Sequence, residues 1–111
     1  MKRYCQMMEM PNDAQLLEKY REVHANVWPI IKEGIREVGI LDMQIFMRGN
    51  VAFMIMDTTD DFDFVADNAR LMTLPRQREW EAYVAEFQGK DPNADSTEKW
   101  QIMENIFLLN E

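Results

Sequence analysis

Two apolar segments of strand length, separated by three residues, are the feature that most limits how this chain can fold. They are ILDMQIFM at 40–47 and VAFMIMDT at 51–58, and Arg48-Gly49-Asn50 joins them. Glycine and asparagine readily adopt the positive φ angles that a tight hairpin requires. We therefore predict that the two segments pair as neighbouring antiparallel strands.

The part of the chain before this hairpin predicts a strand followed by helix. Residues 2–10 have the composition of a strand that ends at Pro11. Apolar residues then recur every three or four positions, which is typical of an amphipathic helix. Because Pro29 disfavours helical geometry at the residue before it, we expect two helices at about 13–25 and 28–38, or one kinked helix.

The part of the chain after the hairpin predicts two helices and a closing strand. Aspartates that can cap a helix precede a helix at about 61–71. Pro75 suits the first turn of a second helix near 75–87. A loop, GKDPNADSTE, follows, and WQIMENIFLL at 100–109 has the composition of a final strand.

The order of these elements is strand, helix, strand, strand, helix, strand. With right-handed crossovers it predicts an α+β fold, a ferredoxin-like antiparallel sheet with helices packed on one face. A length of 111 residues is that of one domain, so we assign 1–111 to a single domain.

The strand at 51–56 is apolar on both faces, which has a consequence for assembly. An antiparallel sheet with one face in water alternates apolar and polar residues, and this strand does not. A second copy of the chain would cover the additional apolar face. We therefore expect a homodimer with face-to-face sheets. The two faces carry Val51, Phe53 and Ile55, and Ala52, Met54 and Met56.

Charge and composition argue against several classes of function. With 20 acidic and 12 basic side chains the net charge is −8, which repels nucleic acid and anionic membrane surfaces. One cysteine, Cys5, and one histidine argue against a disulfide framework and a dedicated transition-metal site. The longest strictly apolar run, 51–56, is far shorter than the ~20 residues of a membrane span. We expect a cytoplasmic protein.

His24 is the only histidine, and its position allows two interpretations. It can be a polar residue at the edge of the apolar helix stripe, hydrogen-bonded to a carbonyl freed near Pro29. It can instead be a general acid or base, since imidazole titrates near neutral pH. Tyr20 lies one helical turn earlier, so the polar ends of both side chains could reach one ligand.

Other candidates also have a structural and a functional interpretation. Trp80 and Trp28 are large apolar residues suited to core packing, but a carbohydrate site would use their indole faces against sugar C–H bonds. Asp42 and Glu104 are acidic residues within apolar strands, where a carboxylate needs a partner. Each can be a site residue or a partnered residue at an exposed edge.

The segment YREVHANVWP at 20–29 resembles the signature region of the L-rhamnose mutarotase family. In that family a tyrosine, a histidine four residues later and a nearby Trp-Pro recur in this arrangement. The similarity continues through REVGILDMQIFMRGNVAFMIMD, RQREWEAYV and MENIFLL, and so covers nearly the whole chain. The resemblance implies a dimeric α/β barrel of ferredoxin-like units that interconverts the anomers of 6-deoxy-L-hexoses without cofactor or metal.

The resemblance also implies roles for individual residues. His24 matches the proton donor of the family, Tyr20 a substrate-binding tyrosine, and Trp80 the second of two adjacent tryptophans in the substrate pocket. Glu79 stands where the first of those tryptophans would be, and Met43 where a substrate-contacting tyrosine would be. These differences argue against L-rhamnose as the substrate, and the segments DMQIFMRGN and FMIMD resemble the branch of the family associated with L-fucose.

Two other functions remain as alternatives at the level of sequence. Dimeric α/β barrels also include small monooxygenases that use haem or no cofactor, in which the histidine would act as a ligand or in oxygen chemistry. A non-catalytic sugar-binding domain would bind a 6-deoxysugar without accelerating anomer exchange. The absorbance change on adding haem and the rate of anomer exchange distinguish the three functions.

Overall fold

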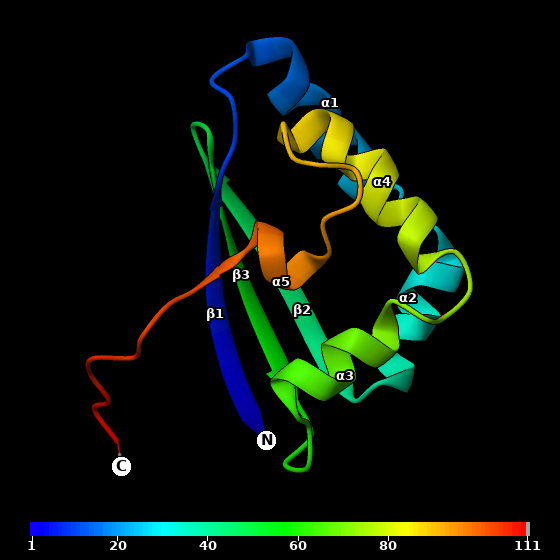
Figure 1. Cartoon of the computed structure of the whole chain (residues 1–111). Helices are drawn as coiled ribbons and strands as arrows, with labels where there is room; N and C mark the ends of the chain where they lie inside the picture. The colour runs from blue at the N-terminus through cyan, green and yellow to red at the C-terminus, as the bar shows by residue number, and fades with distance from the viewer. Residues whose placement is uncertain (111) are drawn as a thin grey trace.

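A computed structural model describes residues 1–110 and contains one four-stranded antiparallel sheet (Figure 1). The strand order in the sheet is β2-β3-β1-β4. This arrangement is the ferredoxin-like sheet that the order of predicted elements indicates. The strands are β1 (Lys2–Glu9), β2 (Ile40–Arg48), β3 (Val51–Thr58) and β4 (Gln101–Ile102).

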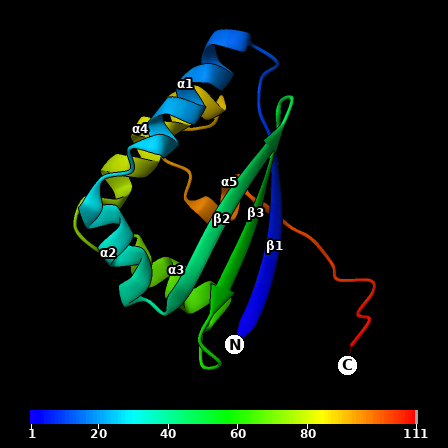
Figure 2. The same ribbon diagram turned by 180° about the vertical axis from the view of Figure 1, so that it is seen from behind.

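The five helices of residues 1–110 all lie on one side of the sheet, and this placement is visible in the two opposite views (Figures 1 and 2). Among the described residues, none of these helices has the length and apolar character needed to cross a membrane. The helices are α1 (Ala14–Ala25), α2 (Pro29–Glu37), α3 (Phe64–Leu71), α4 (Gln77–Gln88) and α5 (Ser96–Lys99).

The separation of α1 from α2 places His24 at the end of a helix. Asp13 caps the start of α1 by accepting hydrogen bonds from the backbone N–H groups of residues 15 and 16. At the other end Trp28 has an extended ψ of 133°, and Pro29 is the first residue of α2. Proline is favoured there because its missing N–H would have no helical partner. The expectation of two helices is confirmed.

The predicted hairpin is confirmed. Gly49 in its turn has a φ of +59°, and the side chain of Asn50 donates a hydrogen bond of 2.8 Å to the Met10 carbonyl. β2 and β3 pair from Ile40–Thr58 to Arg48–Val51, with an irregularity near Asp42. The hairpin therefore presents alternate residues of β2 and β3 to the helices.

The hydrophobic core lies between the sheet and the helices. From the sheet it takes the side chains at alternate positions, including Met8, Met54 and Met56. From α1 it takes Leu17, Tyr20 and Val23, which are spaced by three residues and share one helix face. The helices contribute further large side chains, among them Ile31, Leu71, Trp80, Val84 and Phe87.

The other face of the sheet, which we call the outer face, has no covering element in the described part of the chain. Register places Gln44, Ile55 and Cys5 in one row across it, and Phe46, Phe53 and Met7 in the next. Phe46 is 52% exposed. Both faces of the strand at 51–56 are apolar, but only one is covered within residues 1–110.

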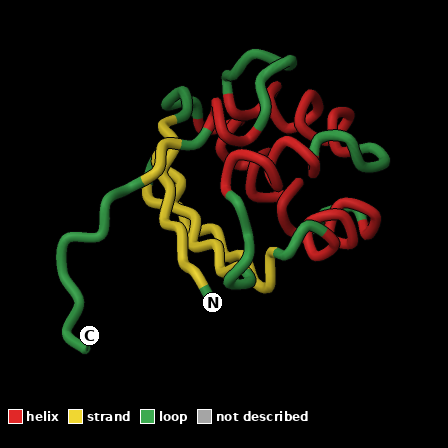
Figure 3. The backbone as a smooth tube through the Cα atoms, turned by 60° about the horizontal axis from the view of Figure 1, so that its bottom comes forward, coloured by secondary structure: helices red, strands yellow, loops and turns green. Residues whose placement is uncertain are grey.

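The predicted closing strand at 100–109 is wrong for most of its length. β4 contains only Gln101 and Ile102. Met103 still donates a backbone hydrogen bond of 2.8 Å to the Cys5 carbonyl, and the chain after it leaves the sheet (Figure 3). Residues 106–109 are four consecutive apolar residues. Side chains of a strand alternate between two faces, so a sheet with one covered face could bury only half of them. They are 59–87% exposed.

The predicted loop at 89–98 contains an additional short helix. Asp95 and Glu98 form a reciprocal capping box at the start of α5. In such a box each side chain accepts a hydrogen bond from the backbone of the other residue. The next residues, Lys99 and Trp100, are both buried, so α5 closes one side of the space between sheet and helices.

Candidate active site

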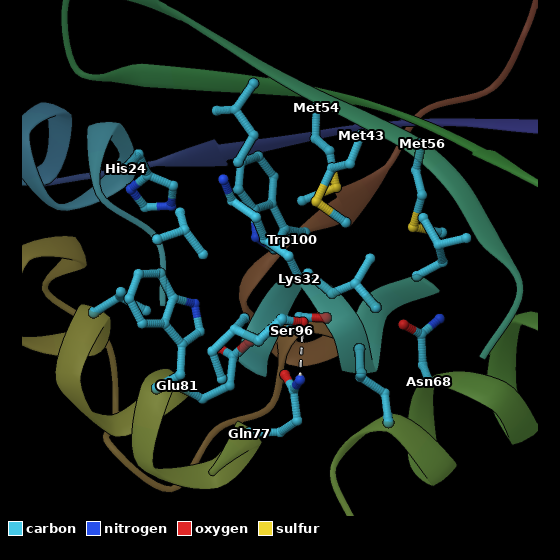
Figure 4. Close-up of a pocket in the computed structure, with 18 of the residues that line it drawn as sticks. His24, Lys32, Met43, Met54, Met56, Asn68, Gln77, Glu81, Ser96 and Trp100 are labelled. Atoms are coloured by element: carbon cyan, nitrogen blue, oxygen red, sulfur yellow. Dashed lines mark hydrogen bonds between the residues drawn. The ribbon is translucent and has the colours of Figure 1, made fainter. Parts of the chain in front are cut away.

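A cavity of about 420 Å³ lies between the sheet and the helices (Figure 4). Its volume is within the ~300–1,000 Å³ typical of small-molecule sites. Most of its wall is apolar, and a few polar groups reach it from several elements. These groups include Gln6 from β1, Tyr20 and His24 from α1, Asn68 from α3, and Gln77, Glu81 and Gln88 from α4.

His24 lies in the last turn of α1, half-buried at the cavity wall. Its Nδ1 is 2.9 Å from the backbone carbonyl oxygen of Tyr20. The imidazole centre lies 4.2 Å from the Tyr20 ring and 5.9 Å from the Trp80 ring. The helix and two aromatic rings therefore hold the imidazole in one orientation.

This hydrogen bond determines which nitrogen of His24 is available for chemistry. A carbonyl oxygen only accepts, so in the neutral imidazole Nδ1 carries the hydrogen and Nε2 keeps its lone pair. Burial lowers the pKa of His24 from its usual 6.5, and the bond to the Tyr20 carbonyl opposes that shift. His24 is therefore a neutral base at physiological pH, with Nε2 as the accepting atom.

Tyr20 contributes a buried hydroxyl to the same cavity. The residue is 1% exposed, and burial raises the pKa of its hydroxyl well above the usual value. Gln88 lies nearby and lowers this pKa, yet neither the Tyr20 hydroxyl nor Gln88 Oε1 has a hydrogen-bond partner of normal geometry within the described residues. Two such groups in a cavity are suited to a polar ligand.

Trp80 and Met43 line the cavity from opposite sides. Trp80 lies on α4 and is buried, and Met43 lies on the helix-facing side of β2 and is half-buried. Asp42, one residue earlier on this edge strand, also reaches the cavity wall. Four predicted site residues, His24, Tyr20, Trp80 and Met43, are thus brought together around one space.

Trp28 and Glu79 lie beside the cavity and do not line it. The ring of Trp28 is 5.0 Å from Trp80 and stacks at 5.6 Å on Tyr83. The Arg76 guanidinium lies 4.3 Å above the Trp28 ring, and Arg76 also forms an exposed ion pair with Glu79. Trp28 therefore reaches the cavity wall through its contact with Trp80. Glu104 lies in the exposed segment after β4.

The polar residues of α4 that line the cavity are not among the site residues predicted from the sequence. Gln77, Glu81 and Gln88 lie on the same face as Val84, with spacings of four, three and four. Polar residues at a spacing that faces a core are the signal that would have identified them. Across residues 1–110, no three His, Cys, Asp or Glu side chains come close enough together to hold a metal ion.

The sequence of the chain is similar to that of sugar mutarotases. A sequence model described as L-rhamnose mutarotase matches residues 3–109. An L-fucose mutarotase from Xanthomonas campestris is 34% identical over 113 residues, a match that covers 100% of this chain and 90% of that protein. An L-rhamnose mutarotase from Paraburkholderia phytofirmans is 28% identical over 93 residues, with 84% and 83% covered.

The fold is also that of a solved structure. The crystal structure of an L-rhamnose mutarotase from Formosa agariphila superposes with a TM-score of 0.71 at 18% sequence identity. The match covers 99% of this chain and 100% of the other. The common architecture therefore includes the elements that form the cavity.

Proposed function

The chain belongs to the L-rhamnose mutarotase family, and on that premise we propose that it interconverts the α and β anomers of a 6-deoxy-L-hexose. It is an isomerase, and its proposed substrates are L-fucose first and L-rhamnose next. The observation that carries the proposal is the position of His24 at the cavity wall. Its Nδ1 is hydrogen-bonded to the Tyr20 carbonyl, and its Nε2 is free.

Mutarotation requires two proton transfers and no redox step. The anomeric O1–H loses its proton, the C1–O5 bond breaks with its electron pair on O5, and O5 gains a proton. The resulting aldehyde turns about C1–C2 and closes on its other face. The Nε2 lone pair of His24 takes the O1 proton during opening and returns one to O1 during closure.

The neighbouring residues suit a sugar that carries a methyl group. The flat face of Trp80 offers packing for sugar C–H bonds, and Met43 adds an apolar, adaptable contact. The unpaired hydroxyl of Tyr20 and the amide of Gln88 supply hydrogen bonds for sugar hydroxyls. Trp28 packs against Trp80 in an edge-to-face contact and so supports the proposed stacking residue.

The preference for L-fucose has two supports. The relative named as an L-fucose mutarotase is 34% identical, compared with 28% for the L-rhamnose mutarotase reported above. Met43 also replaces the tyrosine expected at a substrate contact, and a site that loses a hydrogen-bond partner discriminates strongly between sugars. Glu79 replaces an apolar stacking residue by a carboxylate and changes the environment around Arg76 and Trp28.

Anomeric exchange measured by saturation-transfer NMR tests this proposal. We predict faster exchange for L-fucose than for L-rhamnose, with D-glucose poorest because it lacks the methyl terminus and has the opposite configuration. Met43→Tyr should move the preference towards L-rhamnose, whereas Tyr83→Phe, which keeps the ring outside the cavity, should leave it unchanged. A wild type that prefers L-rhamnose would contradict the assigned preference.

We further propose that the functional unit is a homodimer that acts in the cytoplasm. The apolar outer face supports the dimer: Phe46, Phe53 and Met7 form one row across three strands. Such a face is typically covered by another surface.

A further inference from the structure

A buried ion pair lies at the cavity wall, and the proposed role of His24 does not account for it. The ammonium group of Lys99 on α5 is 2.8 Å from Oε2 of Glu81 on α4. Lys99 also donates a hydrogen bond of 2.7 Å to the Glu81 backbone carbonyl. The exposed fractions of the two side chains are 0% for Lys99 and 14% for Glu81.

Stability alone is a weak reason for such a pair. Two charges lose their hydration on burial, and apolar residues of the same volume often give equal or greater stability. Within residues 1–110 no other acidic side chain forms an ion pair with Lys99. Lys99 therefore serves to hold one carboxylate, that of Glu81, in a fixed place.

The carboxylate held by Lys99 has one oxygen free for a ligand. Oε2 accepts the hydrogen bond from Lys99, while Oε1 makes no hydrogen bond in the described part of the chain, and Glu81 is one of the residues that line the cavity. Glu81 and His24 line the same cavity, and they enter it from α4 and α1 (Figure 4). Trp80, next to Glu81 in sequence, contacts the His24 ring.

We propose that Glu81, positioned by Lys99, is the second proton-transfer group of the mutarotase reaction and works with His24 on a bound sugar. This inference rests on the proposed function and supplies the group that serves O5. His24 Nε2 serves O1, and Glu81 Oε1 serves the ring oxygen. Lys99 is a positioning residue because it acts only through Glu81.

The proton balance of the pair closes without any further reactant. In the active state His24 is neutral and Glu81 carries one proton on Oε1, while Oε2 still accepts the hydrogen bond from Lys99; the ion pair is the form in which Glu81 has lost that proton. During ring opening Glu81 gives that proton to O5, the C1–O5 electron pair moves onto O5, and His24 takes the proton from O1. The pair again holds one proton, now on His24, and closure on the other face of the aldehyde returns both groups to their first state.

The surroundings bring the proton affinities of the two groups towards each other. Burial lowers the pKa of His24 from 6.5. Burial also raises the pKa of Glu81 from 4.5; Lys99 opposes this shift and Asp95 adds to it. Both shifts act in the direction that suits an acid and a base working as a pair. The charge of Glu81 also contributes to the raised pKa of Tyr20, and the other charged side chains at the cavity are Lys32, Arg36 and Asp42.

The first test compares Glu81→Gln with Glu86→Gln by NMR exchange of L-fucose anomers. Glutamine keeps an oxygen that accepts from Lys99 but does not transfer protons. We expect Glu81→Gln to slow catalysed exchange by at least about 10²-fold. Glu86 lies on the exposed side of the same helix, so Glu86→Gln should retain the wild-type rate. A folded Glu81→Gln with the wild-type rate overturns the inference.

The pH profile separates a role in proton transfer from a role in packing. A pair that shares one proton gives the wild type a bell-shaped profile. Glu81→Gln should keep only the acidic limb, which belongs to His24. A variant profile identical to that of the wild type contradicts the inference, and so does a wild-type profile with one limb.

A double variant covers the case in which Glu81→Gln does not fold. Glu81→Gln combined with Lys99→Met removes both charges and leaves no unpaired buried ion. It should fold, as circular dichroism would show, and lose exchange as the single variant does; full activity in it also overturns the inference. A wild type that accelerates no sugar contradicts the proposed function itself, and activity in both wild type and Glu81→Gln contradicts only the role of Glu81.

Discussion

At the scale of single residues, the behaviour of His24 follows from its burial and from one hydrogen bond. The neutral ring donates a hydrogen bond from Nδ1 to the Tyr20 carbonyl. Protonation of Nε2 would place a positive charge in a partly buried position. The sequence identified this residue and Tyr20 by their spacing. The carbonyl partner of the imidazole was predicted to be one freed near Pro29. In the structure it is the carbonyl of Tyr20, one helical turn earlier.

The lowered pKa of His24 predicts a dependence of stability on pH. The folded pKa lies below the unfolded value of about 6.5, so between these two values the unfolded chain binds more protons. The free energy of unfolding should therefore rise with pH through this window and gain nothing further from His24 above it. Urea unfolding at a series of pH values measures this.

His24→Gln is the control for that titration, because glutamine is polar and does not titrate. The difference in unfolding free energy between wild type and variant should change across the window below pH 6.5 and be constant above it. A constant difference throughout would show that the His24 pKa is not lowered by folding.

At the scale of secondary structure, the sequence predicted correctly those helix ends and turns that depend on one residue and its own backbone. Asp13 as a cap, Pro29 as a first helical residue and Gly49 in a turn each act through their own backbone. The prediction of a closing strand at 100–109 was wrong because strand formation depends on pairing with a distant strand, which the local sequence does not show. β4 pairs with β1 at only two positions, Gln6 and Met7.

The cavity wall shows the same limit of local information. The helix at α4 was predicted from its apolar residues Trp80, Val84 and Phe87. Its polar cavity residues were not recognised; these are Gln77, Glu81 and Gln88. Their role depends on α5, which brings Lys99 to Glu81 from 18 residues away. Asp95 and Glu98 have the spacing of a capping box, but the segment was predicted as a loop because its single helical turn lies among loop residues.

At the scale of the whole molecule, the outer face of the sheet predicts self-association. We expect light scattering to give twice the 13.2 kDa chain mass at micromolar concentration. Phe46→Asp places a charge on the outer face and should produce a monomer. Val65 is 76% exposed on α3, on the helical side, so Val65→Asp should remain a dimer. A stable wild-type monomer would rule out the proposed assembly.

The central claim is that His24 catalyses anomer exchange of a 6-deoxy-L-hexose, and exchange of L-fucose by wild type and His24→Ala tests it most directly. Saturation-transfer NMR should show strong acceleration by the wild type and at least about 10²-fold less by a folded His24→Ala. Asn26→Ala, an exposed change two residues away, should retain the rate. A folded His24→Ala with full activity would contradict the claim.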